Sequence, residues 1–264
     1  MSVNGKDQAP LFFFGNTNNT VVNAEIAHAA TAGVKLLELS AELPWVGFNT
    51  GQLASALKQN PDALFLLRVA MYPPNSWLVD HPMPMSMNDQ AMQGAFPSLA
   101  SDELAEHWNR QLELLVRFLG RGQYRDRIIG IHPTYLSGGE WFYLDLESYY
   151  YDYCEANRAR FAAWAQAQYG GDLTALNAAW KTSVAGFSAV QIPRTAQWAA
   201  GDDGWFRNPS LQRWMTDYQK YHNDLISDRL IAMADKVKAV SNNQMLFAAF
   251  HGYQMELLGN GSTK

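Results

Sequence analysis

The sequence predicts an α/β protein in which parallel β-strands are covered by helices. Apolar runs without polar alternation, such as Leu11–Gly15 and Ala63–Ala70, are typical of strands buried on both faces. Segments with helical periodicity separate these runs, so strand and helix alternate along the chain. With 264 residues, 48% of them hydrophobic, the chain is long enough to bury such a core. The rival is an open doubly wound sheet, but no Gly-x-Gly-x-x-Gly follows the first strand.

Five strands are expected. In chain order they are Leu11–Gly15, Val34–Leu39, Ala63–Ala70, Arg127–His132 and Met245–His251. The helices expected between and after them are Val21–Ala32, Gly51–Lys58, Ser101–Leu119, Tyr149–Tyr169, Asp172–Trp180 and Pro209–Val240. Gly33 fits the residue just past a helix end, and "SDEL" (101–104) places acids in a first turn, where the helix dipole favours them. No linker divides residues 1–264, so a single domain is expected.

Composition narrows the possible partners. The net charge is −5 and the chain has no long run of Lys or Arg, which argues against nucleic acid. Cys154 is the only cysteine, so no internal disulfide can form, and no Cys/His cluster has zinc spacing. We take Cys154 as structural. The start lacks a signal peptide and no segment reaches membrane-spanning length, so a cytoplasmic protein is expected unless a targeting segment has been lost.

Polar and aromatic side chains follow each expected strand. Ligands of parallel α/β folds bind at the carboxyl ends of strands. The residues at these positions are Asn16, Asn18, Glu42, Trp45, Tyr72, Asn75, Trp77, His81, His132, Tyr135, Glu140, Trp141, His251 and Tyr253. Rings that stack on sugar faces, with amides and acids that bind hydroxyls, suit a neutral polyhydroxylated ligand. A phosphate site would instead need a Gly-rich loop with Lys or Arg.

Some of these residues also have a structural interpretation. Trp77, in "PPNSW", is either a sugar platform or a packed lid, and His81 and His251 are either sugar ligands or structural histidines. Glu38 lies in mid-strand, where a buried ion pair with Arg68 is favoured over a role in the site.

Four stretches resemble a known family. They are "LLRVAMYPPNSWLVDHP" (66–82), "FPSLASDELAEHW" (96–108), "RDRIIGIHPTYLSGGEWF" (125–142) and the run from "YYYDYCEANRARF" to "QIP" (149–193). Together they resemble β-galactosidase-like glycosidases of family 42 and their clan A relatives. The resemblance implies a (β/α)₈ TIM barrel with a helical insertion after strand four, here about 142–208. It also implies hydrolysis of β-galactosides or similar glycosides with retention.

The resemblance assigns the general acid/base to Glu140, by motif position. Trp141, Phe142 and Tyr135 would supply the apolar surroundings that raise a carboxyl pKa. Clan A enzymes usually carry Asn immediately before the acid/base to hold the sugar 2-hydroxyl. This chain has Gly139 there, so another residue such as Asn16 or His132 would have to supply the contact.

The nucleophile of the family lies on a later strand than the five expected here. The other acids at the strand ends, Glu42, Asp145 and Glu256, match no nucleophile position. The chain is therefore expected to be the front part of a barrel, about five βα units. An open parallel sheet is prone to association, so a stable product would need extra chain, a partner or a homo-oligomer.

Three functions stay open at this point. The first is a glycoside hydrolase with a carbohydrate substrate, Glu140 as acid/base and no metal or organic cofactor, because two carboxylates and a water complete the reaction. The second is a non-catalytic carbohydrate-binding barrel remnant. The third is another barrel enzyme such as an aldolase or lyase, and it ranks last because no lysine is placed for a Schiff base.

Overall fold

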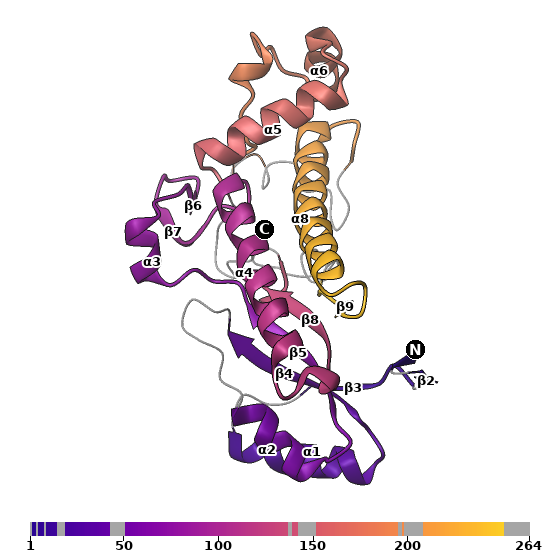
Figure 1. Ribbon diagram of the computed structural model, residues 1–264. Helices are drawn as coiled ribbons and strands as arrows, with labels where there is room; N and C mark the ends of the chain where they lie inside the picture. Colours follow the sequence, from indigo (N-terminus) through magenta and orange to yellow (C-terminus); the bar gives the residue numbers. More distant parts are fainter. Residues whose placement is uncertain are drawn as a thin grey trace. The chain divides into compact units, whose positions relative to one another are not determined.

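A computed structural model describes most of the chain and divides it into two compact units (Figure 1). The described residues are 2–3, 5–7, 9–14, 19–42, 51–136, 139–141, 152–194, 197 and 208–250. Unit 1 comprises Met1–Pro74, His107–Tyr135 and Ile231–Phe250, and unit 2 comprises Asn75–Glu106, Leu136–Leu230 and His251–Lys264. Helices α4 (Asp102–Arg121) and α8 (Arg213–Val240) each continue from one unit into the other.

Unit 1 is built on a five-stranded parallel sheet. Its strands, in spatial order, are β3 (Phe12–Phe14), β4 (Leu36–Glu42), β5 (Leu64–Ala70), β8 (Ile128–Thr134) and β9 (Leu246–Phe247). Figure 1 shows β4, β5 and β8 side by side, and every neighbouring pair is parallel. The five predicted strands therefore form one parallel sheet, and the α/β fold is confirmed.

The order of the strands distinguishes a (β/α) barrel from an open doubly wound sheet. The spatial order of the strands equals their order in the chain, without a reversal. Connections between parallel strands are almost always right-handed, so a sheet that grows in one direction receives all its helices on one face. A doubly wound sheet reverses direction and is covered on both faces. The observed order is that of a (β/α) barrel wall.

The two faces of the sheet differ in chemistry. On one face the side chains are apolar and almost fully buried: Leu37, Leu39, Phe65, Leu67, Val69 and Ile131. Successive side chains of a strand alternate between faces, and partners in a parallel register share a face. The other face therefore carries Glu38, Ser40, Arg68 and His132 beside its leucines. The apolar face suits the helices, which leaves the polar face as the inner face of the wall.

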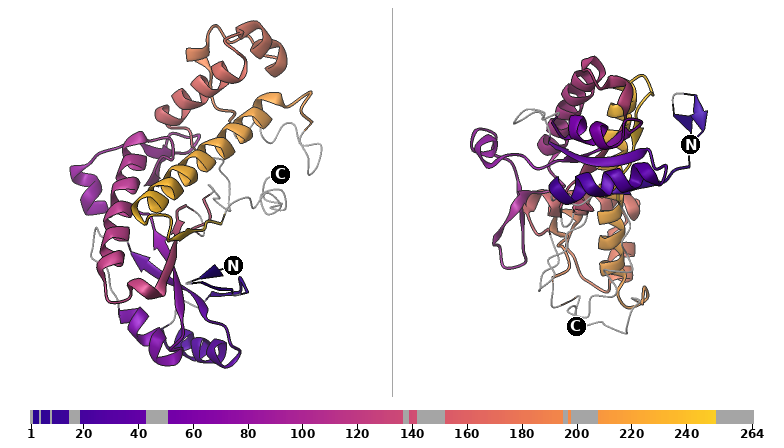
Figure 2. Two further views of the ribbon diagram at one scale, coloured as in Figure 1. Left: turned by 45° about the vertical axis from the view of Figure 1, so that its right-hand side comes forward. Right: turned by 90° about the horizontal axis from the view of Figure 1, so that it is seen from below.

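Helices of unit 1 begin and end close to the predicted positions. Helix α1 (Asn19–Thr31) packs beside α2 (Gly51–Gln59), as Figure 2 also shows. Gly33 has a φ of 76°, and Val34 N–H donates to Ala29 O at 2.8 Å, which confirms the glycine as the residue past the helix end. In α4, the Trp108 indole N–H donates to Met71 O at 2.8 Å.

Unit 2 contains elements that the sequence pattern did not predict. They are the short helix α3 (Asn75–Asp80) and the antiparallel hairpin of β6 (Met85–Met87) and β7 (Gln93–Pro97). Unit 1 likewise contains an unpredicted hairpin of β1 (Ser2–Val3) and β2 (Lys6–Asp7) and the 3-10 turn η1 (Arg125–Arg127). The strands of these hairpins are too short for periodicity to reveal.

The remaining helices of unit 2 are α5 (Glu155–Gln168), α6 (Leu173–Trp180) and the 3-10 turn η3 (Phe187–Ala189). The predicted start of α5 at Tyr149 was wrong, because Asp152 and Cys154 lie outside the helix. Asp152 Oδ1 accepts hydrogen bonds from Cys154 N–H and from Met87 N–H of β6, both at 3.0 Å. These bonds hold the backbone extended up to Cys154, where α5 begins.

Two further predicted boundaries were wrong. Helix α8 begins at Arg213 rather than Pro209, because Asn208 forms a turn first: its Oδ1 accepts from Ser210 N–H at 2.9 Å. Within the described part of the expected strand Met245–His251, which ends at Phe250, β9 comprises Leu246 and Phe247.

A buried polar network joins α5 to α8 within unit 2. Asn157 Nδ2 donates to the Tyr218 hydroxyl at 2.9 Å, and the Tyr221 hydroxyl donates to Asn157 Oδ1 at 2.6 Å.

Burial raises the pKa of the Cys154 thiol to about 11, so the thiol stays protonated and unreactive near neutral pH. The burial of Cys154 and its hydrogen bonds to Asp152 support a structural role for this residue.

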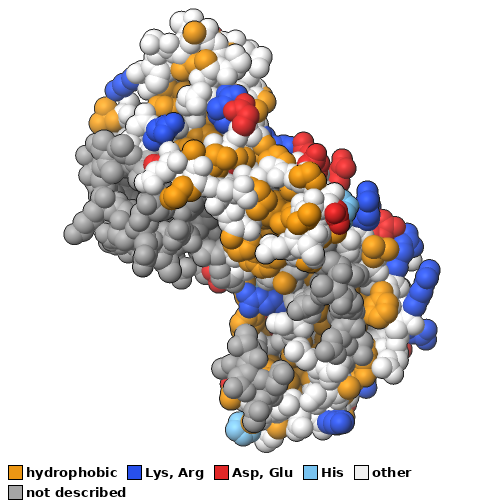
Figure 3. All heavy atoms as spheres, turned by 90° about the vertical axis from the view of Figure 1, so that its left-hand side faces the viewer, with side chains coloured by type: hydrophobic (Ala, Val, Ile, Leu, Met, Phe, Trp, Pro, Cys, Tyr) orange, Lys and Arg blue, Asp and Glu red, His pale blue; other side chains and the backbone are white. Residues whose placement is uncertain are grey.

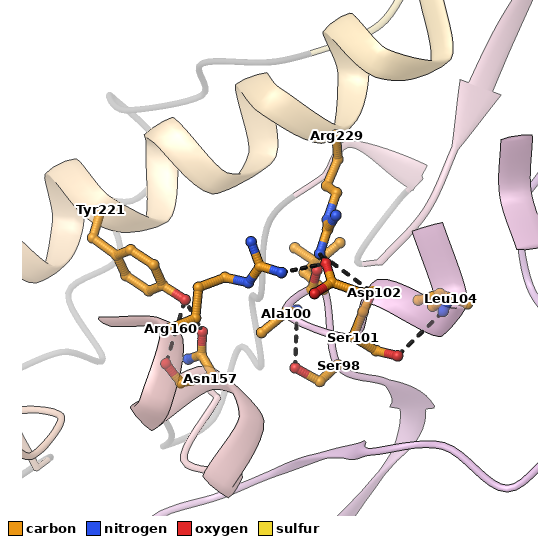
Figure 4. Close-up of polar contacts among 10 residues, drawn as sticks. Ser98, Ala100, Ser101, Asp102, Leu104, Asn157, Arg160, Tyr221 and Arg229 are labelled. Atoms are coloured by element: carbon orange, nitrogen blue, oxygen red, sulfur yellow. Dashed lines mark hydrogen bonds and ion pairs between the residues drawn. The ribbon is translucent and has the colours of Figure 1, made fainter. Parts of the chain in front are cut away.

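An ionic cluster fixes the start of α4 in the same unit (Figure 4). The Ser101 hydroxyl accepts from Leu104 N–H at 3.2 Å and caps the helix. Asp102 in the first turn pairs with Arg160 of α5 and with Arg229 of α8. Arg229 also donates to Leu99 O at 3.0 Å. One carboxylate therefore ties three helices together.

Candidate functional site

The predicted site residues fall into several groups in the structure. Asn16, Trp45 and His251 lie outside the described residues, as do Asn18 and Tyr253. Glu42 is the last residue of β4 and pairs in register with Ala70 of β5, and only its backbone is described. The remaining predicted residues are placed in one unit or the other.

Two strand ends of unit 1 meet through aromatic rings. Tyr72 follows β5 and Tyr135 follows β8, and their ring centroids lie 5.1 Å apart. Trp108 of α4 packs edge-on against Tyr135 at 4.8 Å. Tyr135 is fully buried, so its ring is part of the packed core next to the end of β8. Burial raises the pKa of the Tyr72 hydroxyl, although the nearby charge of Arg68 acts in the opposite direction.

The inner face of the sheet holds a buried carboxylate–imidazole pair. Glu38 Oε1 of β4 and His132 Nδ1 of β8 lie 2.8 Å apart, and both residues are less than a tenth exposed. Strand β5 lies between the two strands. His132 also meets the Phe250 ring edge-on, with centroids 4.5 Å apart. The structure thus places the predicted site residue His132 in the carboxyl half of its strand, on the polar face.

The expected pairing of Glu38 with Arg68 is wrong. Among the described residues, the hydrogen-bonding partner of the Glu38 carboxylate is His132. The Arg68 guanidinium lies 4.9 Å from the Phe14 ring centroid and 5.8 Å from that of Phe250, in cation–π geometry. The sequence pattern could not identify the partner, because His132 lies two strands from Glu38.

Glu140 lies in unit 2, in an unusual turn after β8. It is partly buried and stands between Gly139 (φ 80°) and Trp141 (φ 63°). Leu136 also has a positive φ of 62°, and its carbonyl accepts from Gly139 N–H at 3.0 Å. A left-handed backbone is uncommon for a bulky residue such as Trp141, whose side chain is fully buried. Backbone strain of this kind clusters at active sites and ligand clamps.

Trp77 and His81 pair with each other in unit 2. Their rings stack with centroids 4.1 Å apart and planes 6° apart, and Trp77 O lies 3.0 Å from His81 Nδ1. Both side chains keep some exposed area. The sequence placed both residues after strand β5 and missed that α3 would bring them one helical turn apart.

Charge is mixed on the surface. Figure 3 shows acidic and basic side chains interspersed along one border of the face that it draws. No group of three or more His, Cys, Asp or Glu residues in the described part of the chain is placed to hold a metal ion. Within the described helices, none is long and apolar enough to cross a membrane.

Comparison with known families confirms the resemblance predicted from the sequence. Residues 143–261 match the family model described as beta-galactosidase. The matched segment begins three residues after Glu140, so it does not include the acid/base candidate. No curated protein sequence matches the chain.

Solved structures share the fold. A β-galactosidase from psychrophilic Marinomonas ef1 superposes with a TM-score of 0.60 at 15% identity, over 90% of this chain and 36% of its own. A cold-adapted β-galactosidase from Rahnella sp. R3 gives 0.59 at 14%, over 94% and 38%. An exo-β-agarase gives 0.50 at 12%, over 87% and 27%. The chain therefore spans little more than a third of the two β-galactosidases, and the likeness establishes an α/β fold of their barrel type.

Proposed function

We propose that this chain carries the general acid/base of a glycoside hydrolase that acts on β-galactosides or related β-glycosides with retention. Glu140 is that residue. The observation that carries the proposal is the turn around this residue: a partly buried carboxylate stands between two left-handed residues, six positions after the end of strand β8. The match of residues 143–261 to the beta-galactosidase model and the fold of the solved β-galactosidases support the reaction class.

The chemistry follows from the position of a single carboxyl group. Protonated Glu140 gives its proton to the glycosidic oxygen as a second carboxylate attacks the anomeric carbon and the glycosidic bond breaks. The ionised Glu140 then takes a proton from water, whose oxygen displaces the enzyme carboxylate from the sugar and releases it with retained configuration.

The nucleophile of the reaction is not assigned. No carboxylate of this chain matches the position of the nucleophile in the family that it resembles, so only the acid/base is assigned. The proposed architecture is a TIM-barrel catalytic domain over residues 1–264, represented here by about five βα units, with the helical insertion at about 142–208. Cytoplasmic location and homo-oligomerisation stay predictions from the sequence.

Substrate contacts are proposed for the other residues at the strand ends. Trp77 and His81 present a stacked aromatic pair suited to a sugar face, and His132 presents a ring nitrogen on the inner face. Asn16, Glu42, Trp45, Tyr135, Trp141 and His251 complete the proposed set.

The test compares turnover of nitrophenyl β-glycosides by the wild-type chain, Glu140→Gln and Glu106→Gln. Glu106 is an exposed acid of α4 in the same unit, so its variant controls for the change in charge. We expect at least a hundredfold loss of turnover in Glu140→Gln alone. Measurable turnover that is equal in all three proteins would exclude Glu140. Sugar binding without turnover in any of them would instead favour a non-catalytic carbohydrate-binding barrel remnant.

A further inference from the structure

His132 leaves one ring nitrogen buried without a partner. Its Nδ1 faces Glu38, whereas no described residue donates to or accepts from Nε2, although His132 is only 1% exposed. A buried polar atom that lacks a hydrogen bond costs about 1–3 kcal/mol of stability. Such atoms are rare in native proteins, and an absent ligand or water is a common explanation. The imidazole is therefore a candidate ligand-binding group.

The pair spans an intervening strand. Glu38 pairs in register with Leu66 of β5, and Arg68, two residues further along β5, pairs with His132. Neighbouring strands are about 4.8 Å apart, so two side chains that bridge two spacings must converge above the inner face. Convergence of this kind is expected on the concave side of a curved sheet. The hydrogen bond thus directs both side chains toward the interior of the wall.

The position of the pair fits a ligand site rather than a lone core contact. His132 is the fifth of the seven residues of β8, in the half of the strand that leads to the ligand-binding edge. Phe250 meets His132 edge-on, and the Phe14 and Phe250 ring centroids lie 6.0 Å apart. A hydrogen-bonding nitrogen beside aromatic rings matches the hydroxyls and C–H faces of a sugar.

We propose that Glu38 is a positioning residue that accepts the Nδ1 proton of His132, so that Nε2 accepts a hydrogen bond from a hydroxyl of a neutral sugar. The inference rests on the proposed carbohydrate ligand and adds Glu38 to the site. A carboxylate fixes the tautomer of a neutral imidazole by accepting from one nitrogen, which leaves a lone pair on the other. Sequence pattern alone had assigned Glu38 to a structural ion pair.

The first arm of the test reads the tautomer directly. Long-range ¹H–¹⁵N spectra of the chain labelled with ¹⁵N-histidine assign the proton of His132 to Nδ1 or Nε2. We expect Nδ1–H in the wild-type chain and a shift of the Nε2 resonance on addition of methyl β-D-galactoside. Exchange toward Nε2–H is expected in Glu38→Leu, which removes the acceptor. An Nε2–H tautomer in the wild-type chain would overturn the proposal, whether or not the sugar binds.

The second arm measures affinity for methyl β-D-galactoside by calorimetry in a matched pair of variants. The amide of His132→Asn reaches the place of Nδ1, near Glu38, whereas the amide of His132→Gln reaches the place of Nε2. We expect about tenfold weaker binding for His132→Asn and a smaller loss for His132→Gln. His28→Asn, the same change at an exposed residue of α1, should bind like wild type.

The outcomes separate this inference from the proposed function. Wild-type affinity in His132→Asn would overturn the role of His132 and leave a carbohydrate-binding chain intact. Absence of binding in the wild-type chain and in every variant would overturn the carbohydrate ligand itself, and this inference with it. Circular dichroism of each variant verifies folding, and the wild-type tautomer needs no variant.

Discussion

The rings of Tyr72 and Tyr135 lie 5.1 Å apart, and each belongs to a residue just beyond the end of its strand. The contact joins the chain after β5 to the chain after β8 at the edge where parallel α/β folds bind ligands. Trp108 closes the group from α4 and donates its indole N–H to Met71 O. Packed aromatic rings therefore stabilise the backbone next to the carboxyl ends of β5 and β8.

Removal of the Tyr135 ring should destabilise unit 1. Tyr135→Ala would leave a cavity between Tyr72 and Trp108, and comparable losses of a buried aromatic side chain cost about 3–5 kcal/mol. Urea unfolding of the wild-type and variant chains measures the change. Leu114→Ala, at a residue of α4 that is 49% exposed, should cost well under half as much. Similar losses in the two variants would contradict the packing around Tyr135.

Replacement of two glycines of unit 1 by alanine should change the stability of the protein in opposite directions. A Cβ on Gly130 would lie 2.5 Å from Leu246 O and 2.7 Å from Leu246 Cβ, so Gly130→Ala must displace β9. A Cβ on Gly120, in α4, would meet nothing within 4 Å. Gly120→Ala should therefore stabilise the protein by roughly 0.5–1 kcal/mol, because alanine has the higher helix propensity.

Thermal unfolding of these two variants gives the sign of each change. A Gly130→Ala protein as stable as wild type would show that β9 does not approach β8 as described.

The ionic cluster at Asp102 should make the stability of unit 2 sensitive to acid. Desolvation, the largest effect on this carboxyl, raises its pKa, but the hydrogen bonds and charges of Arg229 and Arg160 outweigh it and hold the pKa below the ordinary 3.8. Because the folded state binds the proton more weakly than the unfolded chain, the stabilisation is complete above pH 3.8. It is lost as the pH falls through the folded-state pKa.

The comparison of wild type with Asp102→Asn measures this contribution. We expect about 1 kcal/mol or less at pH 7, because the Asp102 side chain is 71% exposed and solvent screens its charge. The difference should shrink progressively below pH 3.8. Glu103→Gln, in the same helical turn, controls for the helix dipole. A difference between wild type and Asp102→Asn that does not change with pH would show that the arginines do not set the pKa of Asp102.

Much of the fold could be predicted from the sequence because strands and helix boundaries are marked by residues that are close together in the chain. Apolar runs identified the strands of the sheet, and Gly33 and the acidic start of α4 marked two helix boundaries correctly. The start of α5 was not accessible, since it depends on a hydrogen bond from Met87, which is remote in the chain. The hairpins and α3 are too short to carry a period.

Less of the candidate site could be predicted from the sequence, because its contacts join residues that are remote in the chain. Strand-end position made His132 and Tyr135 candidates, but whether a side chain packs in the core or contacts a ligand depends on neighbours from other strands. Tyr135 is fully buried against Tyr72 and Trp108. Glu38 was assigned the wrong partner because pairing across β5 requires the curvature of the sheet.

The proposed hydrolase and the proposed role of His132 both require that this chain binds carbohydrate, and calorimetric titration of the wild-type chain with methyl β-D-galactoside tests that binding most directly. The account predicts saturable binding to one site per chain, with little heat from mannitol, a flexible polyol that lacks the rigid ring face. An absence of heat with methyl β-D-galactoside and with the corresponding β-glucoside, β-xyloside and β-mannoside would contradict the claim.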